Sequence, residues 1–171
     1  MAIFFVSERY LKLYGMITDN VSATDVSPLV QFAAKAFVKS LIGSYFFDDL
    51  LTKYNAQTLS SDELKVVEIM QYAIAWRATA DASISLTYQL KNKGLQKQNG
   101  DNSETVELNE TTFMYDVYLQ KAIYFEAELK KYLLNNKDLY PVFTDKLNKD
   151  NGILGCDGDD NYNGGVGLFI I

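Results

Sequence analysis

Residues 60–92 constrain the fold most, because they predict one long, uninterrupted helix. Ser60 and Glu63 have the spacing of a capping box, in which each side chain satisfies a free backbone N–H of the first turn. Apolar residues then recur at spacings of three and four, and neither Pro nor Gly occurs between residue 60 and Gly94. Because the helix is apolar over much of its circumference, we expect a central helix that other elements cover on several sides.

The second half of this helix is rich in Ala and Ser, so neighbouring helices can approach it closely. Charged residues are scarce there. Arg77 and Asp81 stand four residues apart and can pair on the helix surface.

The rest of the first 147 residues predicts further helices. Gly15 ends a short helix that Ser7 caps, and Gly43 ends a longer one that Asp25 or Ser27 caps, with Pro28 in its first turn. A second long helix carries a stripe of aromatic and aliphatic residues, and the last short helix has Pro141 in its first turn. The expected helices are 8–14, 25–42, a shorter one from 44 to about 54, 60–92, 109–135 and 138–147.

Two segments lack helical patterning. Residues 1–6 form a short apolar run of β type. Residues 92–107 contain turn sequences around Gly94 and Gly100 and predict a protruding loop or β-hairpin between the two long helices. A hairpin with so little apolar content is not stable alone, so this excursion needs a partner or is a mobile loop.

Composition changes after residue 147. Residues 148–167 are dominated by Asn, Asp and Gly, and four apolar residues follow them: Leu168, Phe169, Ile170 and Ile171. This pattern predicts a helical domain over 1–147 and a flexible C-terminal arm over 148–171. The arm is either an unstructured terminus or a segment that docks on another subunit, by β-augmentation or in a pocket.

Composition limits the class of protein. A chain of 171 residues with 48% hydrophobic residues can bury a sizeable core as one domain. The net charge of −6 and the pI near 4.6 disfavour a dedicated nucleic-acid-binding surface. Twelve tyrosines suit partner-facing surfaces and the periphery of a core equally well. The single cysteine excludes an intrachain disulfide, and no apolar run approaches the ~18 residues that a membrane span needs.

No set of residues indicates catalysis. Histidine is absent, which removes the commonest general base and metal ligand. The adjacent acids at 48–49 and 62–63 are explained by the preference for negative charge at helix N-termini. No glycine loop has the pattern of a phosphate site, and Cys156 has no cation or base near it in the sequence. We therefore expect a protein that is not an enzyme and has no cofactor.

One acidic segment partly matches a calcium loop. Asp157, Asp159 and Asn161 occupy the first three ligand positions of an EF-hand. However, Tyr162 stands where Gly is required and Leu168 where the bidentate Glu belongs. A solvated acidic loop and weak Ca²⁺ binding both remain open.

Several short motifs, in their order and spacing, resemble the head–tail connector proteins of tailed bacteriophages, in particular the neck ring proteins of crAss-like phages that infect Bacteroides. The resemblance covers residues 3–145 and does not extend to the arm. The motifs are FFVSERYL (4–11), TDNV (18–21), DVSPL (25–29), LIG (41–43), AIAW (73–76), KNKGL (91–95), DNSE (101–104) and LYPVF (139–143).

The resemblance implies an all-α connector fold and a structural role in the virion. Such proteins form a dodecameric ring beneath the portal, continue the DNA channel toward the tail, contact the next neck component and help retain the packaged genome. It implies assembly in the cytoplasm of the infected bacterium and contact with the portal protein and adjacent neck or tail proteins. An acidic chain suits a channel through which DNA passes without specific binding.

A ring needs two different, complementary patches on each subunit. We expect the excursion and the arm to supply interaction residues, and the run at residues 3–6 to be either a third interaction element or part of the core. The interaction residues are Gly94, Leu95, Val106, Leu168, Phe169, Ile170 and Ile171. The alternative function is a small helical adaptor or regulatory protein in a bacterium, acting as a monomer or dimer.

Overall fold

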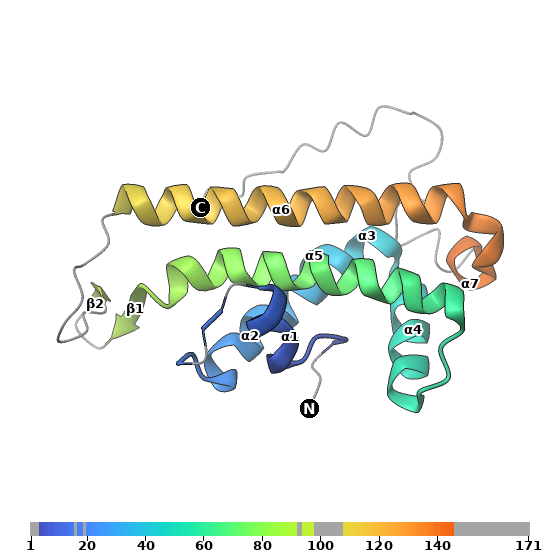
Figure 1. Ribbon diagram of the computed structural model, residues 1–171, viewed down its shortest axis with the longest axis horizontal. Coiled ribbons are helices and arrows are strands. Elements are labelled where there is room, and N and C mark those ends of the chain that lie inside the picture. Colours follow the sequence, from blue (N-terminus) through green and yellow to red (C-terminus); the bar gives the residue numbers. More distant parts are fainter. Residues whose placement is uncertain (1–3, 16, 19, 92–93, 98–107, 146–171) are drawn as a thin grey trace.

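The protein is mainly helical in a computed structural model, which describes residues 4–15, 17–18, 20–91, 94–97 and 108–145. The two longest helices, α5 (Ser61–Ser85) and α6 (Leu108–Asn135), lie side by side and antiparallel (Figure 1). The shorter helices pack around α5 and near the ends of the pair. They are α1 (Glu8–Tyr14), α2 (Ala23–Ala33), α3 (Ser40–Ile42), α4 (Ser44–Ala56) and α7 (Pro141–Thr144), with a π-helical segment η1 (Ala34–Lys39) and a 3₁₀ turn η2 (Lys137–Leu139).

The prediction of a central, capped helix is confirmed. Ser60 Oγ accepts the Glu63 N–H at 3.2 Å, and Glu63 Oε2 accepts the Ser60 N–H at 2.8 Å. The α5 residues in the core are Val66, Val67, Met70, Ala73, Ile74, Ala75, Ala78, Thr79, Ala80 and Ala82. Most of these are small, which lets α1, α2 and α6 all contact the same helix.

The end of α5 lies at Ser85, so the predicted extension to residue 92 is wrong. Near the end of the helix, the hydroxyls of Ser83, Ser85 and Thr87 donate to backbone carbonyls three or four residues earlier. Such bonds compete with continued helical pairing. Thr87 and Tyr88, a β-branched and an aromatic residue, then favour the start of a strand.

A β-hairpin follows α5, as one of the two predicted alternatives. β1 (Tyr88–Lys91) pairs antiparallel with β2 (Gly94–Lys97), with Leu90 opposite Leu95 and Lys91 opposite Gly94. The hairpin therefore reverses between residues 91 and 94 and begins earlier than the predicted excursion of 92–107. The second turn sequence, around Gly100, lies outside the described residues.

The N-terminal run is not a strand where the structure describes it. Phe4 and Phe5 have φ values of 44° and 72°, in the left-handed region. Packing outweighs the β preference, because the Phe5 ring lies 5.4 Å from the ring of Phe47 and 5.2 Å from that of Tyr54. The Phe5 carbonyl also accepts bonds from Tyr54 Oη and Gln71 Nε2. Phe5 and Val6 belong to the core, which was the second interpretation of this run.

The helix predicted at 8–14 is found, and the one predicted at 25–42 is divided into α2, η1 and α3, which end before Gly43 as expected. α1 is capped by Ser7 and ends at Gly15, as expected. A Cβ at Gly15 would lie 2.8 Å from both Leu11 O and Thr79 Oγ1, so glycine allows α1 to approach α5 this closely. α2 begins earlier than predicted, because Ser22 rather than Asp25 or Ser27 is its cap and accepts the Thr24 N–H. Pro28 is consequently inside the helix and not in its first turn.

Aromatic residues pack α7 against α4 and the start of α5. Phe46 on α4 contacts Tyr140 and Phe143, and the Tyr140 hydroxyl donates to the Asp62 carbonyl at the start of α5. The last predicted helix, 138–147, is in fact η2 followed by α7, because Pro141 lacks an N–H and starts a new helix. Within the described residues no helix is both long enough and apolar enough to span a membrane.

Replacing Ser60 with Ala tests the capping box. Loss of the hydroxyl leaves the Glu63 N–H without its partner, so we expect the free energy of unfolding to fall by about 1 kcal/mol in urea titrations. The matched control is Ser61→Ala at the exposed first residue of α5, which should change stability by less than about 0.5 kcal/mol. Equal effects of the two substitutions would contradict a capping role for Ser60.

Candidate functional site

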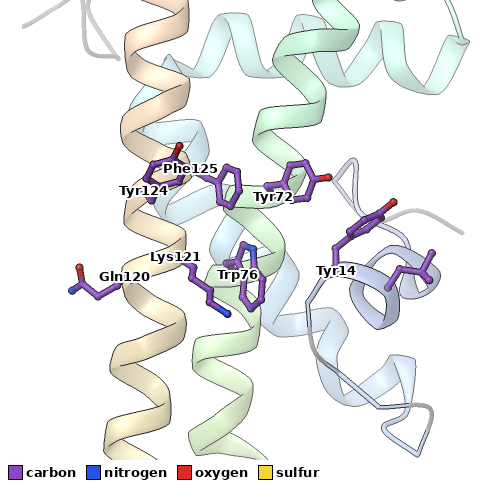
Figure 2. A pocket seen from close by; sticks show the side chains of 8 residues that line it. Tyr14, Tyr72, Trp76, Gln120, Lys121, Tyr124 and Phe125 are labelled. Atoms are coloured by element: carbon purple, nitrogen blue, oxygen red, sulfur yellow. The ribbon is translucent and has the colours of Figure 1, made fainter.

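An open groove of about 680 Å³ lies where α1, α5 and α6 meet (Figure 2). We call it the aromatic groove. α1 contributes two residues, α5 two and α6 four: Leu13, Tyr14, Tyr72, Trp76, Gln120, Lys121, Tyr124 and Phe125. The residues from α5 stand four apart, as do Lys121 and Phe125, so each pair lies on one face of its helix. Its size is in the range of pockets that bind small molecules or a few side chains.

The wall of the groove is built from stacked rings that join α5 to α6. Tyr72 and Phe125 stack with centroids 4.9 Å apart, and Figure 2 shows them facing one another across the two helices. Trp76 stacks on Tyr118 at 5.9 Å. Tyr14 contacts Tyr72 at 5.6 Å and extends the wall onto α1. Because both partners of each stack sit on packed helices, the groove has a preformed shape.

Among the residues that the structure describes, Lys121 is the only charged one that lines the aromatic groove. Its Nζ lies 4.0 Å from the Trp76 ring centroid and 5.5 Å from that of Tyr118, which are cation–π distances. In the part of the chain that the structure describes, no carboxylate forms an ion pair with Lys121. The groove therefore combines apolar surface with one positive charge.

The rim of the groove leaves large apolar side chains in water. Leu13 is 64% exposed, Tyr124 63% and Tyr14 44%. Clustered exposure of this kind marks binding surfaces more often than it marks ordinary surface. Chemically, the site can hold apolar or aromatic groups, and it can add a favourable contact with a nearby negative charge.

Behind the groove, an ion pair joins the same two helices. Arg77 donates to Glu126 through three hydrogen bonds of 2.8–3.0 Å, and the side chains are 11% and 18% exposed. The guanidinium also lies 3.9 Å from the ring of Phe37, on the π-helical segment. Burial raises the pKa of Glu126, and Arg77 opposes that shift. The predicted pairing of Arg77 with Asp81 is wrong, because α6 brings a better-placed carboxylate to the guanidinium.

Asp81 lies partly buried one turn further along α5. Burial raises the pKa of its carboxyl, and the charge of Arg77 lowers it by a smaller amount. The charged form is therefore disfavoured in the folded state.

The predicted interaction residues fall in two groups. Gly94 and Leu95 lie in β2, away from the aromatic groove. Val106, the arm residues Leu168, Phe169, Ile170 and Ile171, and the acidic residues Asp157, Asp159 and Asn161 lie outside the described residues. Sequence reasoning missed the groove itself. The signal was present in the spacing of Tyr72 and Trp76 and in the Tyr-rich second long helix, but it does not distinguish a groove from a core.

The acids singled out in the sequence have structural partners. Lys39 binds Asp48 at 2.8 Å, and Lys53 binds both Asp49 and Glu63 at 2.7 Å. Asp62 pairs with Lys65 on the surface. Over the described residues, no three metal-binding side chains come together.

Removal of Arg77 tests the ion pair. Arg77→Met leaves Glu126 partly buried without its partner, so we expect the free energy of unfolding to fall by about 2–4 kcal/mol. Adding Glu126→Gln should recover part of this loss in a double-mutant cycle measured by urea unfolding. Lys65→Met, which breaks the exposed pair with Asp62, is the control and should have little effect. No recovery in the double variant would show that the two side chains are not coupled.

Asp81→Asn tests how burial of the Asp81 carboxyl makes the free energy of unfolding depend on pH. The folded-state pKa of Asp81 is raised, so its ionisation destabilises the protein as the pH rises through that value. We expect the Asn variant to be more stable than the wild type at pH 7, and the gain to vanish below the ordinary pKa of 3.8, where Asp81 is protonated in both states. Urea titrations at several pH values check this. The exposed Asp116→Asn on α6 carries the same charge change and should not show the gain.

Comparison with known proteins gives one match. Residues 38–153 match a family described as "Family of unknown function (DUF6712)". The matched region includes both long helices and the α5 and α6 walls of the aromatic groove. A search of curated proteins and a search of solved structures gave no match. Since the matched region covers more than half of the chain, the protein belongs to the DUF6712 family, a family of unknown function.

Proposed function

We propose that the protein is a structural subunit of a phage neck, where copies form a ring that extends the portal channel and links head to tail. The motif resemblance suggests the role. The physical feature that carries it is the outer face of α6, which bears large apolar side chains exposed to solvent in a single subunit.

Phe113 and Tyr124 are 66% and 63% exposed. They stand eleven residues apart, which is close to three helical turns, so they lie on one stripe about 16 Å long. Val117, between them on the same stripe, is half-buried. The buried residues of α6 are Thr111, Ala122, Leu129 and Leu133, which lie on the opposite side of the helix. Gln120 lies between Phe113 and Tyr124 on the same stripe, and large apolar side chains turned away from the core in this way are typical of a surface that another protein covers.

A second apolar feature lies elsewhere on the body. Phe32 on α2 is 55% exposed and packs edge-on against Phe37 at 5.6 Å. In Figure 1, α2 lies across α5 from α6. A head-to-tail ring contact needs two different patches on each subunit, and the proposal assigns one to the exposed residues of α6 and the other to Phe32 on α2.

The hairpin supports the same role. Its two strands pair only with each other among the described residues, so both outer edges have unpaired backbone groups. Such edges pair readily with another chain. Gly94 and Leu95 lie on one of these edges, and the proposal assigns them to contacts with a neighbouring subunit, the portal or the next neck component.

The chemistry of the site fits a structural role in the virion and not catalysis or DNA binding. Among the acids on the described helices, Asp48, Asp49, Asp62 and Glu63 pair with lysines and Glu126 pairs with Arg77, while the net charge of the chain is −6. Like charge lets DNA pass along a channel without being held by its phosphates.

Light scattering on the purified chain, with negative-stain images of the same peak, tests the ring. We expect closed rings, alone or after addition of portal protein. Phe113→Ser should shift the mass toward the monomer with unchanged helicity by circular dichroism, because it removes an exposed ring at the interface and not in the core. Leu139→Ser, a similarly exposed residue on η2, is the control and should leave the rings intact.

A protein that stays monomeric and does not bind the portal protein would contradict the proposal and favour the adaptor function. If Phe113→Ser forms rings equally well, the ring proposal stands, but the α6 stripe is not part of the interface between subunits.

A further inference from the structure

We infer that the aromatic groove is the docking site for the apolar end of the chain's own C-terminal segment, Leu168 to Ile171. This inference does not depend on the ring, since it concerns a single subunit. The described residues leave the rim of the groove open, and the inference assigns it a binding function. The occupant is the most apolar segment outside the described residues.

The groove needs an apolar occupant. Leu13, Tyr14 and Tyr124 on the rim keep much of their surface in water, and each would lose apolar exposure against a bound side chain. The wall is already held in place by the Tyr72–Phe125 stack, so binding does not require the helices to move. A volume of about 680 Å³ accommodates a few side chains and not a folded element.

The chain supplies one segment with the matching chemistry. Residues 168–171 are four consecutive apolar residues, one of them aromatic, at the end of a stretch of Asn, Asp and Gly. Phe169 offers a ring for the wall of aromatic rings, where offset and edge-on contacts are favourable. Ile153 and Leu154 form a shorter apolar pair in the same stretch and have no aromatic member.

The length of chain is sufficient. The described residues end at Asp145, and Leu168 follows 23 residues later, which can span at most roughly 80 Å. Asp145 directly follows α7, next to the C-terminal end of α6 (Figure 1). Tyr124 lies eleven residues before that end of α6, or about 16 Å along the helix axis. The segment therefore reaches the groove of its own chain with length to spare, and a covalently attached ligand has a high effective concentration.

Charge complements the apolar fit. Lys121 is the only charged side chain among the described residues that line the groove, and no carboxylate of the described residues forms an ion pair with it. The segment carries Asp157, Asp159 and Asp160 ahead of its apolar end. Docking of residues 168–171 brings these acids within reach of Lys121. It places no second positive charge in the groove.

The single tryptophan makes the docking measurable, because Trp76 lines the groove. In the full chain we expect Phe169→Asp to shift the Trp76 emission to longer wavelength and to increase its quenching by acrylamide. The matched control is Ile153→Asp, which makes the same kind of change in the same stretch outside the docking segment and should leave both readouts unchanged. Circular dichroism checks that helicity is the same in all three proteins.

A substitution on the groove side gives an independent readout. Leu13→Ser removes an exposed rim residue, and we expect it to increase Trp76 quenching in the wild-type background but to add little to Phe169→Asp. A synthetic peptide of residues 164–171 added to the Phe169→Asp protein should reverse the emission shift.

Three results would overturn the inference. Identical Trp76 quenching in wild type and Phe169→Asp would show that the segment does not cover the groove. An equal effect of Ile153→Asp would assign the cover to the other apolar pair. Protection of Trp76 that disappears on dilution would show that the segment comes from a second copy and not from the same chain.

Discussion

The structure depends on the burial of α5 on several sides. A helix buried in this way needs small residues, because three neighbours must approach its axis, and Ala73, Ala78 and Ala82 provide this. Gly15 serves the same purpose on the opposing element, since α1 ends directly against Thr79. The apolar area removed from water along α5 is therefore the main source of stability, and the shorter helices are held in place by their contacts with it.

The antiparallel packing of α6 on α5 has more specific determinants. Hydrophobic burial alone would tolerate several rotations of α6, but the two stacked ring pairs and the Arg77–Glu126 pair are satisfied together in one register. Buried polar pairs select a register in some other proteins, and replacing such a pair with apolar residues is often neutral or stabilising, so we assign Arg77–Glu126 to register more than to stability. The ring of Phe37 on the other side of Arg77 ties the π-helical segment to the same register.

The aromatic groove is a by-product of this register. Tyr72, Trp76 and Phe125 line it and also hold α5 and α6 together through ring stacking, so this part of its shape is fixed by helix packing and not by a loop. A preformed site of this kind binds without the entropic cost of ordering, which suits docking of a segment or a neighbouring protein. Tyr124 belongs to both the groove and the α6 stripe, whereas Phe113, at the other end of the stripe, does not line the groove and is available for a separate contact.

The sequence by itself determined the local features. The capping box at Ser60, the end of α1 at Gly15, the second long helix and the turn near Gly94 depend on short-range chemistry, and all are found in the structure. What only the tertiary structure decided involves residues distant in the sequence. Phe5 packs against the rings of Phe47 and Tyr54 and does not adopt the β conformation that its sequence favours. Arg77 pairs with Glu126 on another helix instead of with Asp81 on its own helix. The groove belongs to this second group, because helical spacing gives the face on which Tyr72 and Trp76 lie but not which neighbour covers them.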